Sequence, residues 1–380
     1  MKEEYNRIRS TIIANLGIDH TAAGDLLNIY FSDDIVPDSL AEFFSKYDIE
    51  YLDYPCVWLA SKLASTLHYN GVPKEQFPRI KGVVKKFAVG NGRQLFALKG
   101  LLEALNKVNI AVMLLNGTAM KVFYEPAETQ YLSDVDILVH SEDIKKTCLV
   151  LEEQGFLLQG MFWRQSSYQK NDVRIVVHST CLRANLLEGD FPDIWQYSLE
   201  TFWQDKRVFV PCPEMMLLIL LEQGLEAFCS RINNSFDSHF VLTFLDIKFF
   251  LGKRTINWEK FNEIVRKSKF SLQVHLMLDI INRLFPGSVP EEILDALVFT
   301  DKDVVNIQNL ISYNIAKKQM NNARTRLDYY RSGFIALWYL NCYYGNRDSC
   351  VSDIIAFPFF INAWNNRGIK GLLSKLGGYR

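Results

Sequence analysis

The sequence predicts a fold of mixed α and β class, in which an α/β unit lies between two helical regions. Over residues 1–90 apolar residues recur at three- and four-residue intervals, which is the spacing of amphipathic helices. Over residues 91–212 helical segments alternate with short apolar segments typical of strands. Helical spacing returns over residues 213–380. We therefore expect an N-terminal helical domain, a central α/β domain and a C-terminal helical domain with these boundaries.

The central region is expected to form one sheet. Its expected elements, in chain order, are a helix at 93–109, a strand at 110–115, a short helix after Gly117, a strand at 134–139, a helix at 141–156, two strands within 166–179 and a strand at 207–211. The two strands within 166–179 flank a Lys-Asn-Asp turn. The sheet should therefore contain four or five strands.

The flanking regions are expected to be helical. In the N-terminal region, residues 39–67 keep helical spacing, and Gly71, Pro73 and Pro78 interrupt the pattern that follows. In the C-terminal region, helices are expected at 213–229, 239–252 and 258–268, followed by others towards residue 380. Proline in the first turn favours the start of the helix at residue 213.

The composition favours a cytoplasmic protein without a membrane span. The chain has 42 Lys and Arg residues, 43 Asp and Glu residues and a formal net charge of −1. Such a chain creates no overall field that would attract nucleic acid or anionic lipid, so any nucleic-acid contact should be local. The N-terminus MKEEYNRIRSTI is charged where a signal peptide is apolar, and no window reaches the roughly 18 apolar residues of a membrane span.

The cysteines are expected to be reduced thiols in the core. They form no Cys-x-x-Cys pair and have no nearby histidine in a zinc-binding pattern. The seven are Cys56, Cys148, Cys181, Cys212, Cys229, Cys342 and Cys350.

Two aspartates one residue apart, Asp134 and Asp136, begin the strand expected at 134–139. Alternate side chains of a strand point to the same face, so the two carboxylates should lie side by side. Like charges this close repel unless a cation lies between them, and Mg²⁺ prefers a few carboxylates together with phosphate oxygens. The pair therefore predicts a site for Mg²⁺, or for Mn²⁺ in its place.

A Gly-Thr turn, Gly117 and Thr118, precedes this pair by one short interval. Glycine allows close approach of the backbone to a bulky anion, and the amides of the following helix N-terminus would face phosphate, with the Thr118 hydroxyl as a further donor. A phosphate-binding turn beside a metal-binding carboxylate pair predicts a site for a nucleoside triphosphate and its divalent cation.

The order of these motifs resembles that of the nucleotidyltransferase superfamily related to DNA polymerase β. The chain is more narrowly similar to a bacterial group called uncharacterised nucleotidyltransferases, over about residues 95–290. The segments that carry the similarity are LLNGTAMKVFYEP, YLSDVDILVHSEDIKKTCLVLEEQGF, VRIVVHS and VPCPEMMLLILLEQG. The resemblance implies a mixed sheet with flanking helices, Gly117 and Thr118 at the triphosphate, and Asp134 and Asp136 as metal ligands.

The resemblance also implies a reaction. A nucleoside monophosphate group would pass from the triphosphate to an acceptor, which could be a small molecule, a peptide or RNA, and pyrophosphate would leave. Further candidates for nucleotide contacts are Ser133, Lys121 and Arg164, although each charged residue, like Lys170, is more often simply solvated. His239 and Asp246 are candidates for approaching the cleft from the later helices.

The chain departs from the family pattern at one position. Members usually carry a third carboxylate two residues before a histidine, and Val176 stands there, before His178. His178 should share a face with Val176 and could act as base or third ligand, or be purely structural, whereas Asp172 lies farther away. The alternative to an enzyme is therefore a non-catalytic module that binds nucleotide or a protein partner on the same scaffold.

Overall fold

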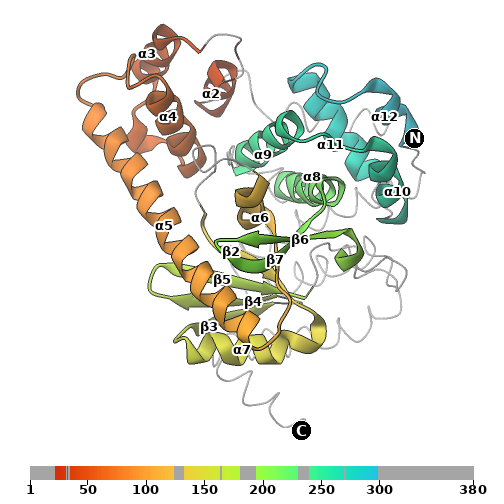
Figure 1. The fold of residues 1–380 in the computed structure, drawn as a ribbon. Coiled ribbons are helices and arrows are strands. Elements are labelled where there is room, and N and C mark those ends of the chain that lie inside the picture. Colours follow the sequence, from red (N-terminus) through yellow and green to blue (C-terminus); the bar gives the residue numbers. More distant parts are fainter. Residues whose placement is uncertain are drawn as a thin grey trace, which may run out of the picture.

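The computed structural model describes residues 22–30, 32, 35–123, 132–162, 165–179, 194–229, 239–268 and 271–297. These residues form a seven-stranded mixed sheet with helices packed around it, which confirms the predicted fold class (Figure 1). The helices predicted beyond residue 297 lie outside the described residues. Within the described residues no helix combines the length and the apolar character needed to cross a membrane.

The N-terminal region is helical as predicted. It contains α2 (Ala22–Tyr30), α3 (Pro37–Lys46), the 3₁₀ turn η2 (Ile49–Tyr51), α4 (Tyr54–Thr66) and α5 (Phe77–Lys107). α4 begins where the Asp53 side chain accepts a hydrogen bond from the backbone N–H of Cys56. α5 continues without a break through residue 90 and passes from the N-terminal helices down along the sheet (Figure 1). The division of the chain into three domains stays a prediction.

The sheet has the strand order β3-β4-β5-β2-β1-β7-β6. Its strands are β1 (Met113–Leu114), β2 (Val135–Leu138), β3 (Leu157–Phe162), β4 (Gln165–Lys170), β5 (Val173–His178), β6 (Ser198–Trp203) and β7 (Lys206–Pro211). β2 pairs in parallel with β5 and antiparallel with β1. The Asp pair, where β2 begins, and the Gly-Thr turn, which follows β1, are therefore associated with neighbouring strands.

The prediction of four or five strands was wrong, because β3 and β6 were missed. Both are edge strands of the seven-stranded sheet. β6 exposes 47% of Leu199 and 70% of Phe202, and β3 has an irregular register between Leu158 and Gly160. Edge strands bury less of their apolar surface, so their sequences carry a weaker strand pattern than central strands do.

Helices cover the sheet and continue beyond it. Between the strands lie α6 (Asn116–Phe123), the turn η4 (Ser141–Asp143), α7 (Ile144–Glu153) and the turn η6 (Ile194–Tyr197). After the sheet follow α8 (Pro213–Cys229), α9 (His239–Lys253), α10 (Trp258–Ser268), α11 (Ser271–Leu284) and α12 (Glu291–Ala296). α6 packs against β2, β7 and α8, whereas α5 packs against α7 and β5.

The described cysteines fit the predicted thiols. Cys56 and Cys212 are buried, Cys148 is partly buried, and no disulfide joins them. The remaining four cysteines have side chains outside the described residues.

Candidate functional site

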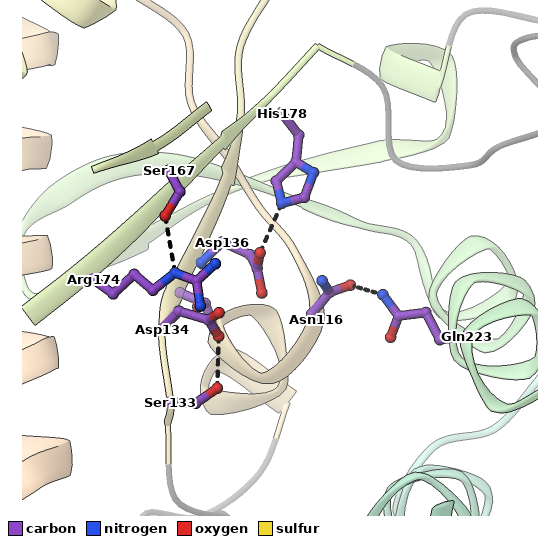
Figure 2. Close-up of polar contacts among 9 residues, drawn as sticks. Asn116, Ser133, Asp134, Asp136, Ser167, Arg174, His178 and Gln223 are labelled. Carbon is purple, nitrogen blue, oxygen red and sulfur yellow. Dashed lines mark hydrogen bonds and ion pairs between the residues drawn. The ribbon is translucent and has the colours of Figure 1, made fainter. Parts of the chain in front are cut away.

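Asp134 and Asp136 lie together where β2 begins. Both carboxylates point to the same side of the strand (Figure 2), and only 13% of the Asp136 side chain is exposed. The pKa of Asp134 lies above its usual value because the carboxyl is buried and because Asp136 lies close by. A hydrogen bond from the Ser133 hydroxyl, 2.8 Å from Asp134 Oδ1, partly offsets this shift. The pair is therefore a crowded anionic centre that a cation would relieve.

Side chains of α5 and α6 hold the backbone of this segment. Asn91 Oδ1 accepts a hydrogen bond from the N–H of Leu132 at 2.8 Å, and the Gln94 side-chain amide donates to the carbonyl of Ser133 at 3.1 Å. The Thr118 hydroxyl accepts a hydrogen bond from the N–H of Asp136 at 3.1 Å. These contacts position the two aspartates without using their carboxylate oxygens.

This geometry favours a positioning role for Thr118. Its side chain is 1% exposed, and its hydroxyl is directed to the backbone of Asp136 rather than to open space. The contact between Thr118 and a triphosphate stays a prediction.

The turn between β1 and α6 is built around Asn116, which sequence reasoning missed. Asn116, not Gly117, adopts the left-handed conformation, with φ of 50°, and asparagine tolerates this region better than most residues. Its side-chain oxygen accepts a hydrogen bond from the Gln223 amide of α8 (Figure 2). An added Cβ at Gly117 would lie 3.2 Å from Leu132 Cδ2. Glycine at 117 therefore leaves room for the residue that precedes Ser133.

β5 lies beside the pair and presents Val176 to it. In the parallel register of β2 and β5, Val176 is the partner of Asp136 and His178 is the partner of Leu138. Val176 is 4% exposed. The position at which the resemblance implies a third carboxylate is thus directly adjacent to Asp136, and it is apolar here.

His178 contacts the pair directly. Its Nε2 lies 2.7 Å from Asp136 Oδ1 (Figure 2), and 14% of its side chain is exposed. A ring nitrogen engaged with a carboxylate fixes the orientation of both groups. The predicted roles of His178 as base or third ligand stay predictions, and the observed contact adds a third possibility, which is to orient Asp136.

Arg174 is a second site residue that sequence reasoning missed. Its Nε donates a hydrogen bond to Ser167 Oγ at 2.9 Å, and its guanidinium points towards Asp134 (Figure 2). Its positive charge contributes to lowering the Asp134 pKa, against the larger effects of burial and of Asp136. The alternation that placed Val176 and His178 on one face extends to Arg174, so the sequence did contain this signal.

Lys121 and Asp246 come together beside α6. Burial lowers the pKa of Lys121 to about 8, while the charge of Asp246 on α9 acts in the opposite direction and that of Lys62 on α4 adds to the shift. The approach of Asp246 and His239 to the cleft stays a prediction. Binding of nucleotide by Lys121 stays a prediction.

The remaining predicted site residues lie at another cavity or outside the described residues. Asp172 contacts Arg93 of α5, and together with Lys170 these residues line a cavity of about 590 Å³. Lys170 Nζ donates to the Gln154 carbonyl at 2.6 Å. Arg164 and the side chain of His239 lie outside the described residues.

The donor set of the pair fits magnesium. Mg²⁺ in proteins commonly takes one or two carboxylates and completes its octahedron with water and substrate phosphate oxygens. Asp134 and Asp136 supply such carboxylates. In the part of the chain that the structure describes, no three His, Cys, Asp or Glu side chains are grouped as a metal centre. The pair would therefore depend on phosphate oxygens of a substrate to hold the ion firmly.

One comparison with known proteins identifies a family. The chain matches the family described as "Uncharacterised nucleotidyltransferase" over residues 57–286, which is more than half of its 380 residues. The match begins within α4, includes all seven strands, and ends two residues beyond α11. Neither a curated protein nor a solved structure matches the chain.

Proposed function

Because the chain belongs to the family of uncharacterised nucleotidyltransferases, we propose that it transfers a nucleoside monophosphate group from a nucleoside triphosphate to an acceptor. The cofactor would be Mg²⁺ or Mn²⁺, and the product released would be pyrophosphate. The observation that carries this proposal is that two partly buried carboxylates, Asp134 and Asp136, lie close together at the start of β2, beside the turn that begins α6.

In this proposal, each of the site residues has its own role in the reaction. Asp134 and Asp136 would hold the divalent ion, which when bound supplies positive charge against the charge that develops on the phosphoryl oxygens. His178 restrains Asp136 through the contact at 2.7 Å. The α6 N-terminus at Gly117 would bind the triphosphate through backbone amides. The nucleotide would then be held for in-line attack on its α-phosphorus by the acceptor, with Ser133, Lys121 and Arg164 as candidates for further contacts.

A second candidate function is supported by Val176. The residue in register with Asp136 is apolar, whereas the resemblance to the superfamily implies a third carboxylate at this position. A protein with two metal ligands and no third could bind nucleotide, or a protein partner, without transferring anything. Such a module would bind NTP with Mg²⁺ but would release no pyrophosphate.

Pyrophosphate release distinguishes the two functions. The full-length protein is incubated with each NTP and Mg²⁺ or Mn²⁺, with cell extract as the source of acceptors, and calorimetry measures NTP binding in parallel. Transfer predicts pyrophosphate release that depends on both extract and metal. Metal-dependent binding without any release would favour the non-catalytic module. No binding of any NTP would contradict both the transferase and a nucleotide-binding module, and would leave a module that binds a protein partner.

Substitution of Gly117 tests the turn. Gly117→Val should weaken NTP binding more than folding, because a branched side chain obstructs approach to the α6 amides and presses on Leu132 beside Ser133. We expect a loss of about 1–3 kcal/mol in unfolding free energy, as for other overpacked sites. Gly117→Ala, which adds Cβ alone, is the matched control. Thermal unfolding with and without NTP and Mg²⁺ separates the effects, and parallel losses would make Gly117 a purely structural turn.

A further inference from the structure

We infer that the acceptor attacks through an oxyanion, either a phosphate monoester or a carboxylate, and that Arg174 binds this group. The inference rests on the proposed transferase function and adds the chemical class of the acceptor. It follows from the side chains that surround the Asp pair, from the apolar Val176 in register with Asp136, and from the way Arg174 is held.

The sheet face that carries Asp136 is neutral or cationic on the two neighbouring strands. Residues in register on adjacent strands point to the same face, so the pairings of β2, β5 and β4 identify its members. Beside Asp136 lie Val176 and then Ser167, and beside Leu138 lie His178 and then Gln165. Arg174 of β5 and its partner on β4, Gln169, lie on the same face. On this face, the carboxylates are therefore Asp136 and Asp134, which directly precedes β2, and neither β4 nor β5 contributes one.

On this face, the side chain in register with Asp136 cannot take a proton from a hydroxyl acceptor. Val176 has no titratable group, and the Nε2 of His178 is engaged with Asp136. Asp172, the nearest carboxylate along β5, contacts Arg93 and lines the cavity beside α5 together with Val173. Val173 and Arg174 point to opposite faces, since neighbouring residues of a strand alternate.

An oxyanion acceptor needs no base. When an alcohol attacks the α-phosphorus, the new O–P bond forms, the bond to the β-phosphate oxygen breaks, pyrophosphate leaves with the electron pair, and one proton must also be removed. When a phosphate monoester or a carboxylate attacks, the same bonds form and break, but no proton is released because the nucleophilic oxygen already carries the charge. The loss of a carboxylate at Val176 is thus compatible with turnover if the acceptor is an oxyanion.

Arg174 has the chemistry and the position to bind such an acceptor. A guanidinium is planar and always charged, and it matches the oxygens of phosphate and carboxylate. The hydrogen bond from its Nε to the buried Ser167 hydroxyl orients the group, and its remaining nitrogens point towards Asp134 (Figure 2). The side chain remains accessible to solvent, so a ligand can reach it. A positive group here would also offset the repulsion between an anionic acceptor and the Asp pair.

The chemical linkage of the product tests the acceptor class. The full-length protein is given NTP labelled at the α-phosphate, Mg²⁺ and cell extract, with one portion of extract treated beforehand by a phosphatase that is then removed. A phosphate acceptor predicts that the labelled product disappears with treated extract. A carboxylate acceptor predicts that hydroxylamine converts the product to a hydroxamate and releases labelled nucleoside monophosphate. A labelled product insensitive to both treatments, as expected for a hydroxyl or amine acceptor, would overturn the inference.

Substitution of Arg174 tests the binding group. Arg174→Gln should raise the acceptor KM by about 10- to 100-fold, the effect of losing a hydrogen bond to a charged group, with little change in the KM for NTP. Arg174→Lys should recover part of the loss. Arg207→Gln, at an exposed arginine that pairs with Glu200 on β6, is the matched control. If Arg174→Gln raises the KM for NTP instead, Arg174 binds the nucleotide and the inference is wrong.

The two levels of the proposal fail differently. Transfer to hydroxyl or amine acceptors would leave the transferase intact and would refute the oxyanion acceptor. Metal-dependent NTP binding without pyrophosphate release from any extract would refute the transferase itself, and the acceptor class with it.

Discussion

Simultaneous replacement of Asp134 and Asp136 by asparagine should abolish metal-dependent NTP binding and nucleotidyl transfer while leaving the protein folded. Asparagine keeps the size of the side chain but removes the charge that would hold Mg²⁺, which prefers anionic oxygen ligands. Calorimetry with Mg²⁺ and NTP measures binding, and pyrophosphate release measures turnover. Binding of both ligands as tight as in wild type would show that the metal site lies elsewhere.

The metal-free stability of this double variant gives a second readout. Burial and the neighbouring Asp136 make the ionised form of Asp134 unfavourable in the folded protein, as its raised pKa indicates. Neutral side chains remove this repulsion, so thermal unfolding without metal should occur at the same or a higher temperature than in wild type. Glu200→Gln with Asp205→Asn, a double neutralisation in the β6–β7 hairpin, is the matched control for the change in net charge. A large fall in stability of the Asp134 and Asp136 variant would contradict the description of the pair as a crowded anionic centre.

Replacement of His178 by alanine should lower turnover by about 10- to 100-fold, mainly through weaker metal binding. His178 contacts Asp136 Oδ1 at 2.7 Å, and groups that orient a metal-binding carboxylate typically contribute an effect of this size. Raising the Mg²⁺ concentration should recover part of the loss. His178→Gln, which can still place a donor near Asp136, should be less impaired than His178→Ala.

The same variants separate positioning from base catalysis. A general base contributes about 10²–10⁴-fold, and its removal lowers kcat at every metal concentration and changes the pH dependence of turnover. A fall in kcat that Mg²⁺ does not recover, with an altered pH profile, would assign His178 as the base and would weaken the case for an oxyanion acceptor. Turnover equal to that of wild type would remove His178 from the site.

Features that neighbouring residues determine could be predicted from the sequence, whereas features that depend on contacts between distant segments could not. The period of two in a strand is local, so the sequence alone indicated that Asp134 and Asp136 lie on one side of β2. Helical periodicity is also local, and helices begin within a residue of the predicted starts at 213, 239 and 258. The edge strands β3 and β6 were missed because edge positions select weakly for an apolar pattern.

Other features of the site were decided by tertiary structure alone. The pairing of β2 with β5 brings His178 to Asp136 across 42 residues, and a side chain of α8, Gln223, reaches Asn116 across 107 residues. The same holds for Asn91, whose bond to the Leu132 N–H spans 41 residues. The residue types show that these side chains can form hydrogen bonds, but no local pattern specifies which strands pair or in which register. The sequence therefore determined the pair of aspartates, whereas the packing of distant segments decided which neighbours surround it.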